Sequence, residues 1–436
     1  MNDLLIYARA VHFAATIMAA GVAFFTVCVA EPAFRKSTTA PLAATLRHRF
    51  AWIAWISLAF CVLSAASWFV LTSASMSGQP LAQIYAQDIL WTVASQTDFG
   101  NDWLARLAFA CGLAGTFVPL LSPNGSASPW LKVATVAFAA ALVGSLAFAG
   151  HAIGAEGAEG IVHPAADVLH LVAAAAWVGS LVPLALLLAA SGDDAATLAV
   201  AQAATLRFST LGIVSVATLL VTGVVNTWYL AGSVDALTET EYGRLLVIKI
   251  ALFFVMVGIA ALNRLRLTPR LVGDDATPAQ DARRALCRNA AIEAALGAAV
   301  IAIVAVLGTL PPGNHANHHA AEGLIPADAS FQHIHGEDGM ADVTIEPGHI
   351  GTASASVHLL NDDLDTLVAR QLTLTLTAPT PGSKAVTRSA IVDADGTWHV
   401  NSLDLTTPGN WTVAVDALLP SGKHLKLAAP IEIGAQ

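Results

Sequence analysis

Eight long apolar stretches constrain this chain more than any other feature of its sequence. A helix that crosses a bilayer needs about 20 mostly apolar residues. Eight stretches reach about that length: residues 4–30, 52–74, 103–121, 130–150, 165–190, 208–231, 245–262 and 289–310. Only 12% of the residues are charged, about half the share in soluble domains, which excludes an ordinary water-soluble enzyme. The first stretch is too long for the core of a cleaved signal peptide, so we expect it to remain as a helix.

Loop charges predict the orientation of these helices, because arginine and lysine collect in loops on the cytoplasmic side of a membrane. The connection after the first stretch carries Arg35, Lys36, Arg47 and Arg49, and the connection before the last stretch carries six arginines. The alternate connections at 75–102, 151–164 and 232–242 contain no lysine or arginine. We therefore expect a multi-pass protein of a bacterial inner membrane with both termini in the periplasm.

The chain changes character after residue 312. Short runs of alternating apolar and polar residues follow, at 341–345, 352–360, 371–377, 385–392, 397–403, 411–417 and 424–433. Short strands at this spacing predict an immunoglobulin-like sandwich of two sheets. We expect a membrane all-α bundle over 1–312, a linker over 313–330 that contains histidines, and a periplasmic β-sandwich over 331–436.

The apolar part contains an internal duplication. His12 precedes Gly21 by nine residues, and His170 precedes Gly179 by nine residues. An Arg-Phe pair follows each histidine after 37 residues, at 49–50 and 207–208, and a hydroxyl residue, Ser64 or Thr222, lies 14 residues beyond each phenylalanine. Four crossings return the chain to the same side, so the spacing predicts two parallel four-helix halves at about 1–150 and 160–312, related by an axis along the membrane normal.

Polar side chains crowd the outer third of the predicted bundle, where polar groups are costly and indicate a functional site. Neutral imidazole is a ligand of copper, zinc, iron and nickel. We expect His12 and His170 to face each other across the axis and to bind a metal ion, with His151 and His163 nearby. The alternative is that these histidines only bond to helix carbonyls. Further polar groups are expected to orient or tune the site: Arg9, Arg106, Asp167, Asn226, Arg244 and Lys249.

The tail offers a second group of ligands. His333 and His335 are separated by one residue, so both imidazoles lie on one face of an extended segment. Met340 follows and offers a thioether, which suits Cu(I) better than Cu(II). We therefore expect His333, His335 and Met340 to bind copper in the sandwich.

Several motifs lie between about residues 163 and 312: His170 to Gly179 with Trp177, Arg207-Phe208-Ser209, Glu241 to Lys249, Asn263-Arg264 with Pro269, and Glu293 before Pro311-Pro312. Together they resemble the CopD family of bacterial inner-membrane copper proteins. The tail, with Met340 to Gly348 and the Trp398 and Trp411 motifs, resembles the YtkA-like β-sandwich domain. The resemblance implies copper import or copper tolerance, with copper ions and periplasmic carriers of the CopC type as partners and Trp177 as a structural residue. No N-terminal histidine of the CopC type is present, so a CopC-style Cu(II) site is not transferred.

Three functions remain open at this point. The first is a copper permease that moves copper from periplasm to cytoplasm. The second is an electron-transfer protein that binds haem b or quinone, because paired intramembrane histidines also serve as axial ligands. The third is a copper sensor or assembly partner without transport. The sequence contains no Gly-Lys-Ser/Thr phosphate loop and no basic excess that would suggest nucleic acid. We expect membrane lipid around the bundle, no enzymatic activity, and Glu293 to balance a nearby arginine.

Overall fold

The computed structural model divides into two compact units, Met1–Ala316 and Asn317–Gln436. It describes residues 2–35, 40–77, 84, 88–122, 128–149, 159–192, 194–231, 238, 240–272, 276–310, 328–336, 339–361, 366–378, 385–393, 396–420 and 422–434.

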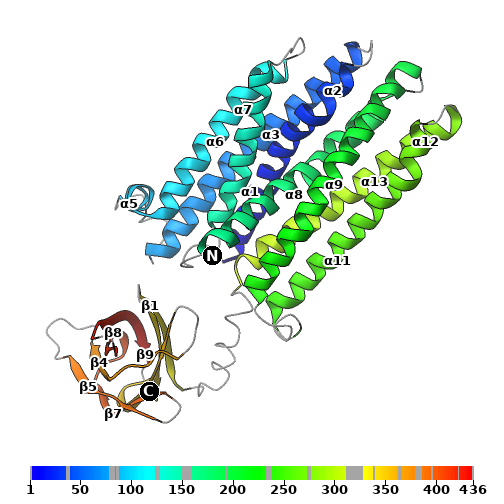
Figure 1. Ribbon diagram of the computed structural model, residues 1–436. Coiled ribbons are helices and arrows are strands. Elements are labelled where there is room, and N and C mark those ends of the chain that lie inside the picture. The colour runs from blue at the N-terminus through cyan, green and yellow to red at the C-terminus, as the bar shows by residue number, and fades with distance from the viewer. Residues whose placement is uncertain are drawn as a thin grey trace. The chain divides into compact units, whose positions relative to one another are not determined.

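The first unit is a bundle of helices (Figure 1). Its first half contains α1 (Asn2–Phe25), which continues through the π-helical η1 (Thr26–Ala30) into α2 (Glu31–Phe34), then α3 (Ala40–Ser77), the short α5 (Ile89–Gln96), α6 (Asp98–Leu120), and α7 (Pro129–Gly144) with η2 (Ser145–Ala149). Its second half contains α8 (Glu159–Ala190), α9 (Ala195–Ala231), α11 (Glu241–Leu262) with the π-helical η3 (Asn263–Leu267) and α12 (Thr268–Val272), and α13 (Ala276–Leu307).

Eight helices of the described chain are long and apolar enough to cross a membrane, which confirms the predicted count. Several continue beyond the predicted apolar stretches: α3 begins at Ala40, α9 at Ala195 and α13 at Ala276. These extensions lie at the ends that carry the arginines. A helix does not end where its apolar face ends, since polar residues such as Arg and Gln are good helix formers.

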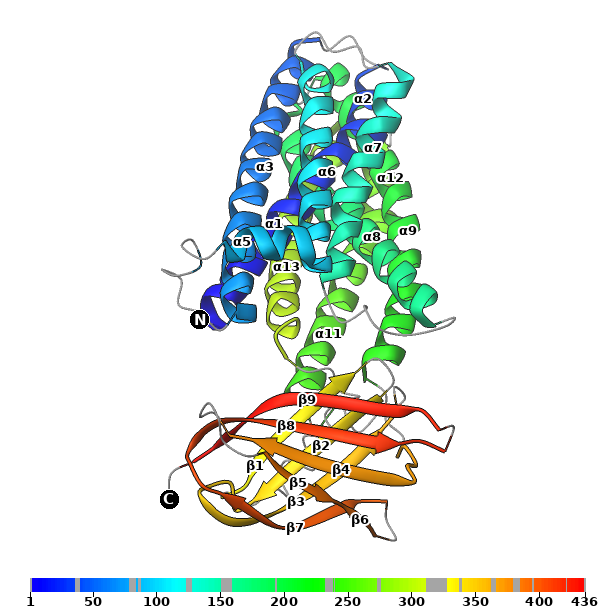
Figure 2. The ribbon, with the colours of Figure 1, turned by 90° about the vertical axis from the view of Figure 1, so that its left-hand side faces the viewer.

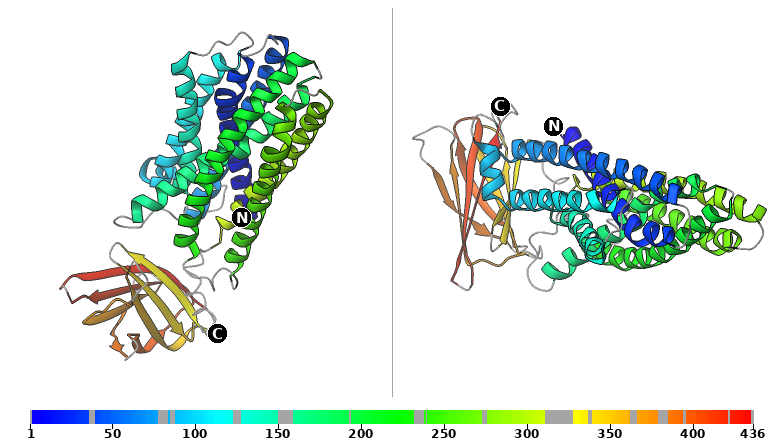
Figure 3. Two further views of the ribbon diagram at one scale, coloured as in Figure 1. Left: turned by 45° about the vertical axis from the view of Figure 1, so that its right-hand side comes forward. Right: turned by 90° about the horizontal axis from the view of Figure 1, so that it is seen from above.

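The core of the bundle lies along α1 and α8 (Figure 3). The apolar segment of α1 is 78% buried and that of α8 is 61% buried, whereas that of α11 is 11% buried. The two central helices cross at Gly21 and Gly179. A Cβ atom on Gly21 would lie 2.2 Å from the Gly179 carbonyl carbon, and Ser180 Oγ donates to the Gly21 carbonyl at 3.2 Å. Small residues allow this close approach of two backbones inside a membrane.

Around this crossing the two halves match. Helix α1 packs against α3 and α7, and α8 packs against α9 and α13. Large apolar side chains such as Trp130 and Val224 are exposed on the outside of the bundle, as expected for surfaces that face lipid rather than water. These contacts are the ones expected of two parallel four-helix halves, and the duplication itself stays a prediction.

The second unit is a two-sheet sandwich (Figure 2). One sheet has the order β1-β2-β3-β7-β6 and the other β5-β4-β8-β9. The strands are β1 (Ser330–Gly336), β2 (Gly339–Glu346), β3 (Gly351–Leu360), β4 (Gln371–Thr377), β5 (Val386–Ser389), β6 (Ile391–Val392), β7 (Trp398–Leu405), β8 (Gly409–Leu418) and β9 (His424–Ile433). Alternate residues of both sheets, among them Val343, Leu374 and Val413, are fully buried between them. The predicted sandwich is confirmed.

Two details of the sandwich differ from the seven predicted strands. The predicted strand at 385–392 is two strands, because β5 pairs with β4 in one sheet and β6 pairs with β7 in the other. The segment with His333 and His335 is itself a strand, β1, paired along its whole length with β2. Alternation alone does not reveal where a strand passes from one sheet to the other.

Candidate metal centre

The His12 imidazole is completely buried in the first half of the bundle. Its Nδ1 lies 3.1 Å from the Cys61 carbonyl oxygen and 3.2 Å from Ser64 Oγ. A carbonyl only accepts hydrogen bonds, so Nδ1 carries the hydrogen and the neutral ring has its lone pair on Nε2. Nε2 is buried and has no hydrogen-bond partner among the described residues. A buried nitrogen lone pair without a partner is a donor atom available to a metal ion.

The His170 imidazole has the matching arrangement in the second half. Its Nδ1 lies 2.9 Å from Thr222 Oγ1, and that hydroxyl donates its own hydrogen to the Thr218 carbonyl at 2.7 Å. The threonine oxygen therefore accepts from Nδ1, which again leaves the lone pair on Nε2. Ser64 and Thr222 each lie 52 residues after their histidine. The sequence pattern identified both hydroxyl residues as repeats, but it did not predict that they orient the imidazoles.

The two histidines lie at one level of the bundle. Helices α1 and α8 are side by side and cross at Gly21 and Gly179, nine residues beyond each histidine. At 1.5 Å per residue, each imidazole lies about 14 Å along its helix from the crossing. That the two rings face each other across the axis stays a prediction.

Two guanidinium groups lie over the indole ring of Trp68, which packs beside His12. The Arg9 and Arg106 Cζ atoms lie 5.3 and 5.4 Å from the Trp68 ring centroid, and the same ring is 5.5 Å from the imidazole. Arg9 Nη1 donates to the Gly308 carbonyl at 2.7 Å, and the buried Arg106 pairs with Asp102 one turn away. Asp102 neutralises a charge that would otherwise repel a cation beside His12. Sequence reasoning missed this partner because its i,i+4 spacing is common on helix surfaces.

The second half carries different groups at the matching positions. Asp167 and Asn226 lie 158 residues after Arg9 and Trp68, the same separation as that of His12 and His170. Asn226 Nδ2 donates to Asp167 Oδ1 at 2.6 Å. Lys249 interacts electrostatically with both Asp167 and His170. This half therefore has a carboxylate and an amide where the first half has a guanidinium and an indole.

The remaining bundle candidates lie outside this inner group. Arg244 is exposed and donates to the Thr238 carbonyl at 3.2 Å. Trp177 packs edge-on against Phe253, with the two ring centroids 6.0 Å apart. His163 lies one turn before Asp167 and interacts with it. His151 lies outside the described residues.

In the sandwich, the register of β1 and β2 places His333 opposite Asp342 and His335 opposite Met340. Residues directly opposite each other on antiparallel strands have Cβ atoms about 4.5–5.5 Å apart. His333 Nδ1 contacts Asp342 Oδ1. The hydrogen bond from the imidazole to this carboxylate raises the pKa of His333, against the opposing effect of its partial burial. The next strand, β3, places His358 on the other side of Asp342.

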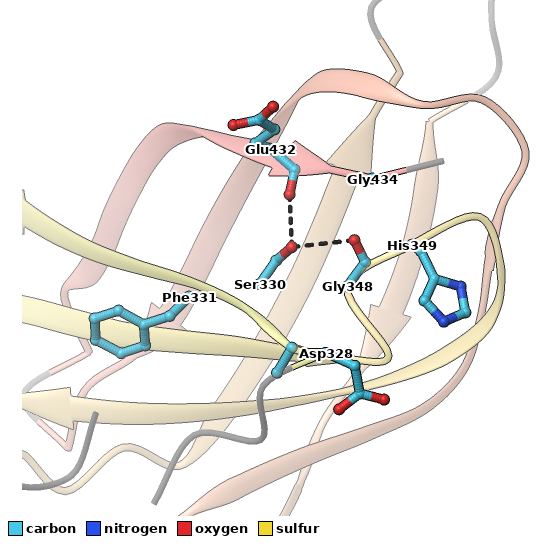
Figure 4. A pocket seen from close by; sticks show the side chains of 8 residues that line it. Asp328, Ser330, Phe331, Gly348, His349, Glu432 and Gly434 are labelled. Atoms are coloured by element: carbon cyan, nitrogen blue, oxygen red, sulfur yellow. Dashed lines mark hydrogen bonds between the residues drawn. The ribbon is translucent and has the colours of Figure 1, made fainter. Parts of the chain in front are cut away.

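A shallow pocket of about 420 Å³ lies elsewhere on the sandwich (Figure 4). Ser330 Oγ is within hydrogen-bonding distance of the Gly348 and Glu432 carbonyls there, at 3.2 and 2.6 Å. The carboxylates of Asp328 and Glu432 point away from each other and from His349. Within the described parts of the chain, no three His, Cys, Asp or Glu side chains gather closely enough to hold a metal ion. A metal centre of these residues therefore depends on a low coordination number, and Cu(I) is a metal that soft and imidazole ligands select.

The fold and the matched histidines define a class: a multi-pass membrane protein made of two four-helix halves, each with an oriented imidazole, followed by a β-sandwich. The family model described as copper resistance protein D matches residues 202–307, and that of the copper resistance protein D-like N-terminal domain matches residues 1–162. Copper resistance protein D of Pseudomonas syringae pv. tomato is 35% identical over 228 residues, which cover 50% of this chain and 71% of the relative. The chain belongs to the copper resistance protein D family, which confirms the resemblance found in the sequence.

Two further relatives extend the comparison. Inner membrane protein YebZ of Escherichia coli (strain K12) is 28% identical over 304 residues, 70% of this chain and 97% of the relative. Copper transport protein CutJ of Bacillus subtilis (strain 168) is 27% identical over 328 residues, 74% of this chain and 56% of the relative. Their names are those of a membrane protein and a transport protein, not of enzymes.

Proposed function

We propose that this chain is a copper-binding protein of the bacterial inner membrane that moves copper from periplasm to cytoplasm and contributes to copper homeostasis or resistance. Membership of the copper resistance protein D family supports copper as the ion that the chain binds. The names of its relatives support a location in the inner membrane and a role in transport. The distribution of Arg and Lys among the loops supports periplasmic termini.

The observation that carries this proposal is the pair of oriented imidazoles. His12 and His170 each have Nδ1 bound to a hydroxyl 52 residues later. Each hydroxyl donates its own hydrogen to a backbone carbonyl, so it accepts from Nδ1 and the lone pair of the ring lies on Nε2. The groups that bind Nδ1 of the two rings carry no charge, and a neutral imidazole is a good metal ligand. Cu(I) bound between two Nε2 atoms in a near-linear site would lie beneath the periplasmic surface, with His163 and His151 on the approach from that side.

The sandwich has a separate role in this proposal. His333, His335 and Met340 collect periplasmic copper, and Asp342 orients the His333 ring through Nδ1 so that its other nitrogen faces the ion. Copper carriers of the CopC type would deliver copper to this surface. The thioether of Met340 favours Cu(I) over Cu(II).

The test is the double variant H12A/H170A of the full-length protein. We expect it to lose one equivalent of tightly bound Cu(I), measured by competition with a Cu(I) chelator, and to lose copper uptake in sealed vesicles. The matched control is H48A, which removes an exposed histidine that accepts a hydrogen bond from Trp52, and it should change neither quantity. The variant H333A/H335A/M340L should retain the bundle equivalent. Unchanged Cu(I) stoichiometry in H12A/H170A would overturn the site.

The same preparations decide between the proposed function and the two other candidates. An absorption spectrum with a Soret band that H12A/H170A abolishes would assign the two imidazoles to haem b. Copper binding without uptake into vesicles would make the chain a sensor or assembly partner.

A further inference from the structure

Glu293 is a buried carboxylate in the middle of α13 whose role the copper site does not explain. Its side chain is 2% exposed. Oε1 accepts a hydrogen bond from Asn263 Nδ2 at 2.8 Å. Oε2 is buried and has no hydrogen-bond partner among the described residues. The arginine partner that the sequence suggested is therefore not found, and its place is taken by a neutral amide.

The amide that binds Glu293 is itself held in place. Asn263 begins the π-helical turn η3 at the end of α11, and its Oδ1 accepts from Asn289 Nδ2 at 2.6 Å. Thr268 Oγ1 donates to the Asn263 backbone carbonyl at 2.9 Å. Single π-helical turns are rare and occur often at functional sites. Two asparagines and a π-turn thus fix one oxygen of the carboxylate and leave the other without a partner.

Three positively charged side chains on or near α13 have partners other than Glu293. Arg264 donates to Ser209, Arg283 donates to the Leu188 carbonyl, and Lys249 interacts with Asp167. Several elements pack against α13: α1, α8, α11, η3 and α12. Their titratable groups with described side chains are Tyr7, Arg9, His12, His163, Asp167, His170, Tyr242, Arg244, Lys249, Arg264, Arg266 and Arg270. Within the described chain, none of them forms an ion pair or a hydrogen bond with Glu293.

A carboxylate that is buried without a counter-charge is unstable in its ionised form, whereas the neutral acid needs only ordinary hydrogen bonds. The contrast with Glu31 shows what an ionised glutamate requires in this bundle. Glu31 is also buried, but Arg47 donates to both of its oxygens, at 2.7 and 3.1 Å. Glu293 has no such partner, so a proton is the simplest way to neutralise it.

Glu293 lies beyond His170 on the way to the other face of the membrane. Gly297 of α13 packs directly against Val178 of α8, and farther along the same interface Cys287 Sγ lies 3.4 Å from the Ala185 carbonyl. Val178 is eight residues beyond His170, and Glu293 is one turn beyond Gly297 in the same direction. At 1.5 Å per residue, Glu293 is about 18 Å deeper than His170.

We propose that Glu293 is an intramembrane proton-binding site, protonated when the bundle is empty, and that it releases its proton when Cu(I) enters the bundle. The step balances without a bond between copper and the carboxylate: one positive charge arrives with Cu(I), the O–H bond of Glu293 breaks, and one proton leaves to water. This inference rests on the proposed copper function and adds a proton to it.

The test is infrared spectroscopy of the full-length protein, which separates the carbonyl stretch of a protonated carboxylic acid from the bands of a carboxylate. We expect an acid band in the copper-free protein that E293Q removes, that E293D retains at a shifted frequency, and that the matched control E31Q leaves unchanged. Addition of Cu(I) should bleach this band in the natural sequence, and it should change no carboxylic-acid band in E293Q. Identical acid bands in the copper-free natural protein and E293Q would overturn the proton site.

Failure of this inference is distinguishable from failure of the proposed function. If the natural protein binds Cu(I) and takes it up into vesicles while the acid band stays constant, the copper function stands and the coupling to Glu293 is wrong. If the natural protein binds no Cu(I), the copper function and the coupling are both wrong, and the band in the copper-free protein still decides whether Glu293 holds a proton.

Discussion

The two halves of the bundle have the same framework and different charges. Each half has a histidine nine residues before a crossing glycine and a hydroxyl 52 residues after the histidine. In the first half an arginine pair encloses Trp68 beside the histidine, whereas in the second half Asp167 and Asn226 bind each other. The backbone crossing and the imidazole orientation are common to both halves, while the surrounding electrostatics differ.

The comparison shows which features the two halves have in common and which features differ between them. The glycines and the histidine–hydroxyl pairs depend on geometry that both halves share. The charged side chains near the histidines can differ because each half neutralises its own charges locally. Asp102 pairs with Arg106 in the first half, and Lys249 interacts with Asp167 in the second. In the proposed copper site, His12 and His170 would therefore be two ligands with unequal surroundings.

The largest expected effect concerns the shared crossing. G21A and G179A would each place a Cβ atom against backbone, 2.2 Å from the Gly179 carbonyl carbon and 2.3 Å from the Ile17 carbonyl oxygen respectively. Backbone cannot rotate away, so the two central helices must separate. We expect each variant to lower the free energy of unfolding by about 3 kcal/mol, the upper range for overpacking, measured by thermal unfolding in detergent.

The matched control is G258A, at a helical glycine where a Cβ atom would have nothing within 4 Å. This variant should stabilise the protein by about 0.5–1 kcal/mol, because alanine is the better helix former. The double variant G21A/G179A should cost less than the sum of the single variants, since one separation relieves both clashes. Additive costs would mean that the halves do not share one crossing.

The sequence predicted most of this framework and little of the site chemistry. Apolar stretches revealed the eight helices, and the repeat revealed Gly21, Gly179 and both histidines. It did not reveal that Asn226 occupies the position in the second half that matches Trp68 in the first, 158 residues earlier. A repeat search finds identical residues, whereas equivalent positions in the two halves have diverged in chemistry.

The partners of the buried groups were also beyond sequence reasoning. Arg106 and Arg244 were both expected to orient or tune the site, yet Arg106 is buried against Asp102 and Arg244 is exposed. Glu293 was expected to have an arginine and has Asn263 instead. Such partners depend on how helices rotate about their axes, and apolar stretches that are buried on one side and lipid-facing on the other fix that rotation only weakly.

A smaller effect tests the difference between the two imidazoles. T222V removes the hydroxyl that binds His170 Nδ1, whereas S64A removes one of two partners of His12 Nδ1 and leaves the Cys61 carbonyl. Loss of the group that orients a ligand costs about 10- to 100-fold in metal affinity. We expect that loss in Cu(I) affinity for T222V and less than about 10-fold for S64A, measured by chelator competition.

Two neighbouring hydroxyl residues provide controls for these variants. The side-chain hydroxyls of Thr218 and Ser67 each donate to the carbonyl one turn earlier on their own helix, so T218V and S67A should leave Cu(I) affinity unchanged. Equal losses in S64A and T222V would show that the Cys61 carbonyl does not hold His12. No loss in T222V would show that the hydroxyl is not needed to orient His170.

The smallest expected effect concerns His333 of the sandwich. Its imidazole binds a carboxylate, whereas the two imidazoles of the bundle bind hydroxyl groups. Asp342 raises the pKa of His333 through a hydrogen bond to Nδ1. In the metal-free protein, D342N should lower the pKa of His333, measured by NMR titration of histidine-labelled protein. The control D416N removes the partner of the exposed His424, 2.6 Å from its Nδ1, and should leave the His333 titration unchanged.

The raised pKa of His333 also determines whether the stability of the sandwich rises or falls with pH. The folded state binds the proton more tightly than the unfolded chain, so the stabilisation is fully present below the unfolded pKa of about 6.5. It is lost as the pH rises through the higher folded pKa of His333. Because the side chains of His333 and Asp342 are 31% and 17% exposed, we expect about 0.5 kcal/mol. The free energies of unfolding of the sandwich in the natural sequence and in D342N should therefore differ at pH 5.5 and become equal at high pH. A difference that grows with pH would show that Asp342 stabilises the fold without the charge on His333.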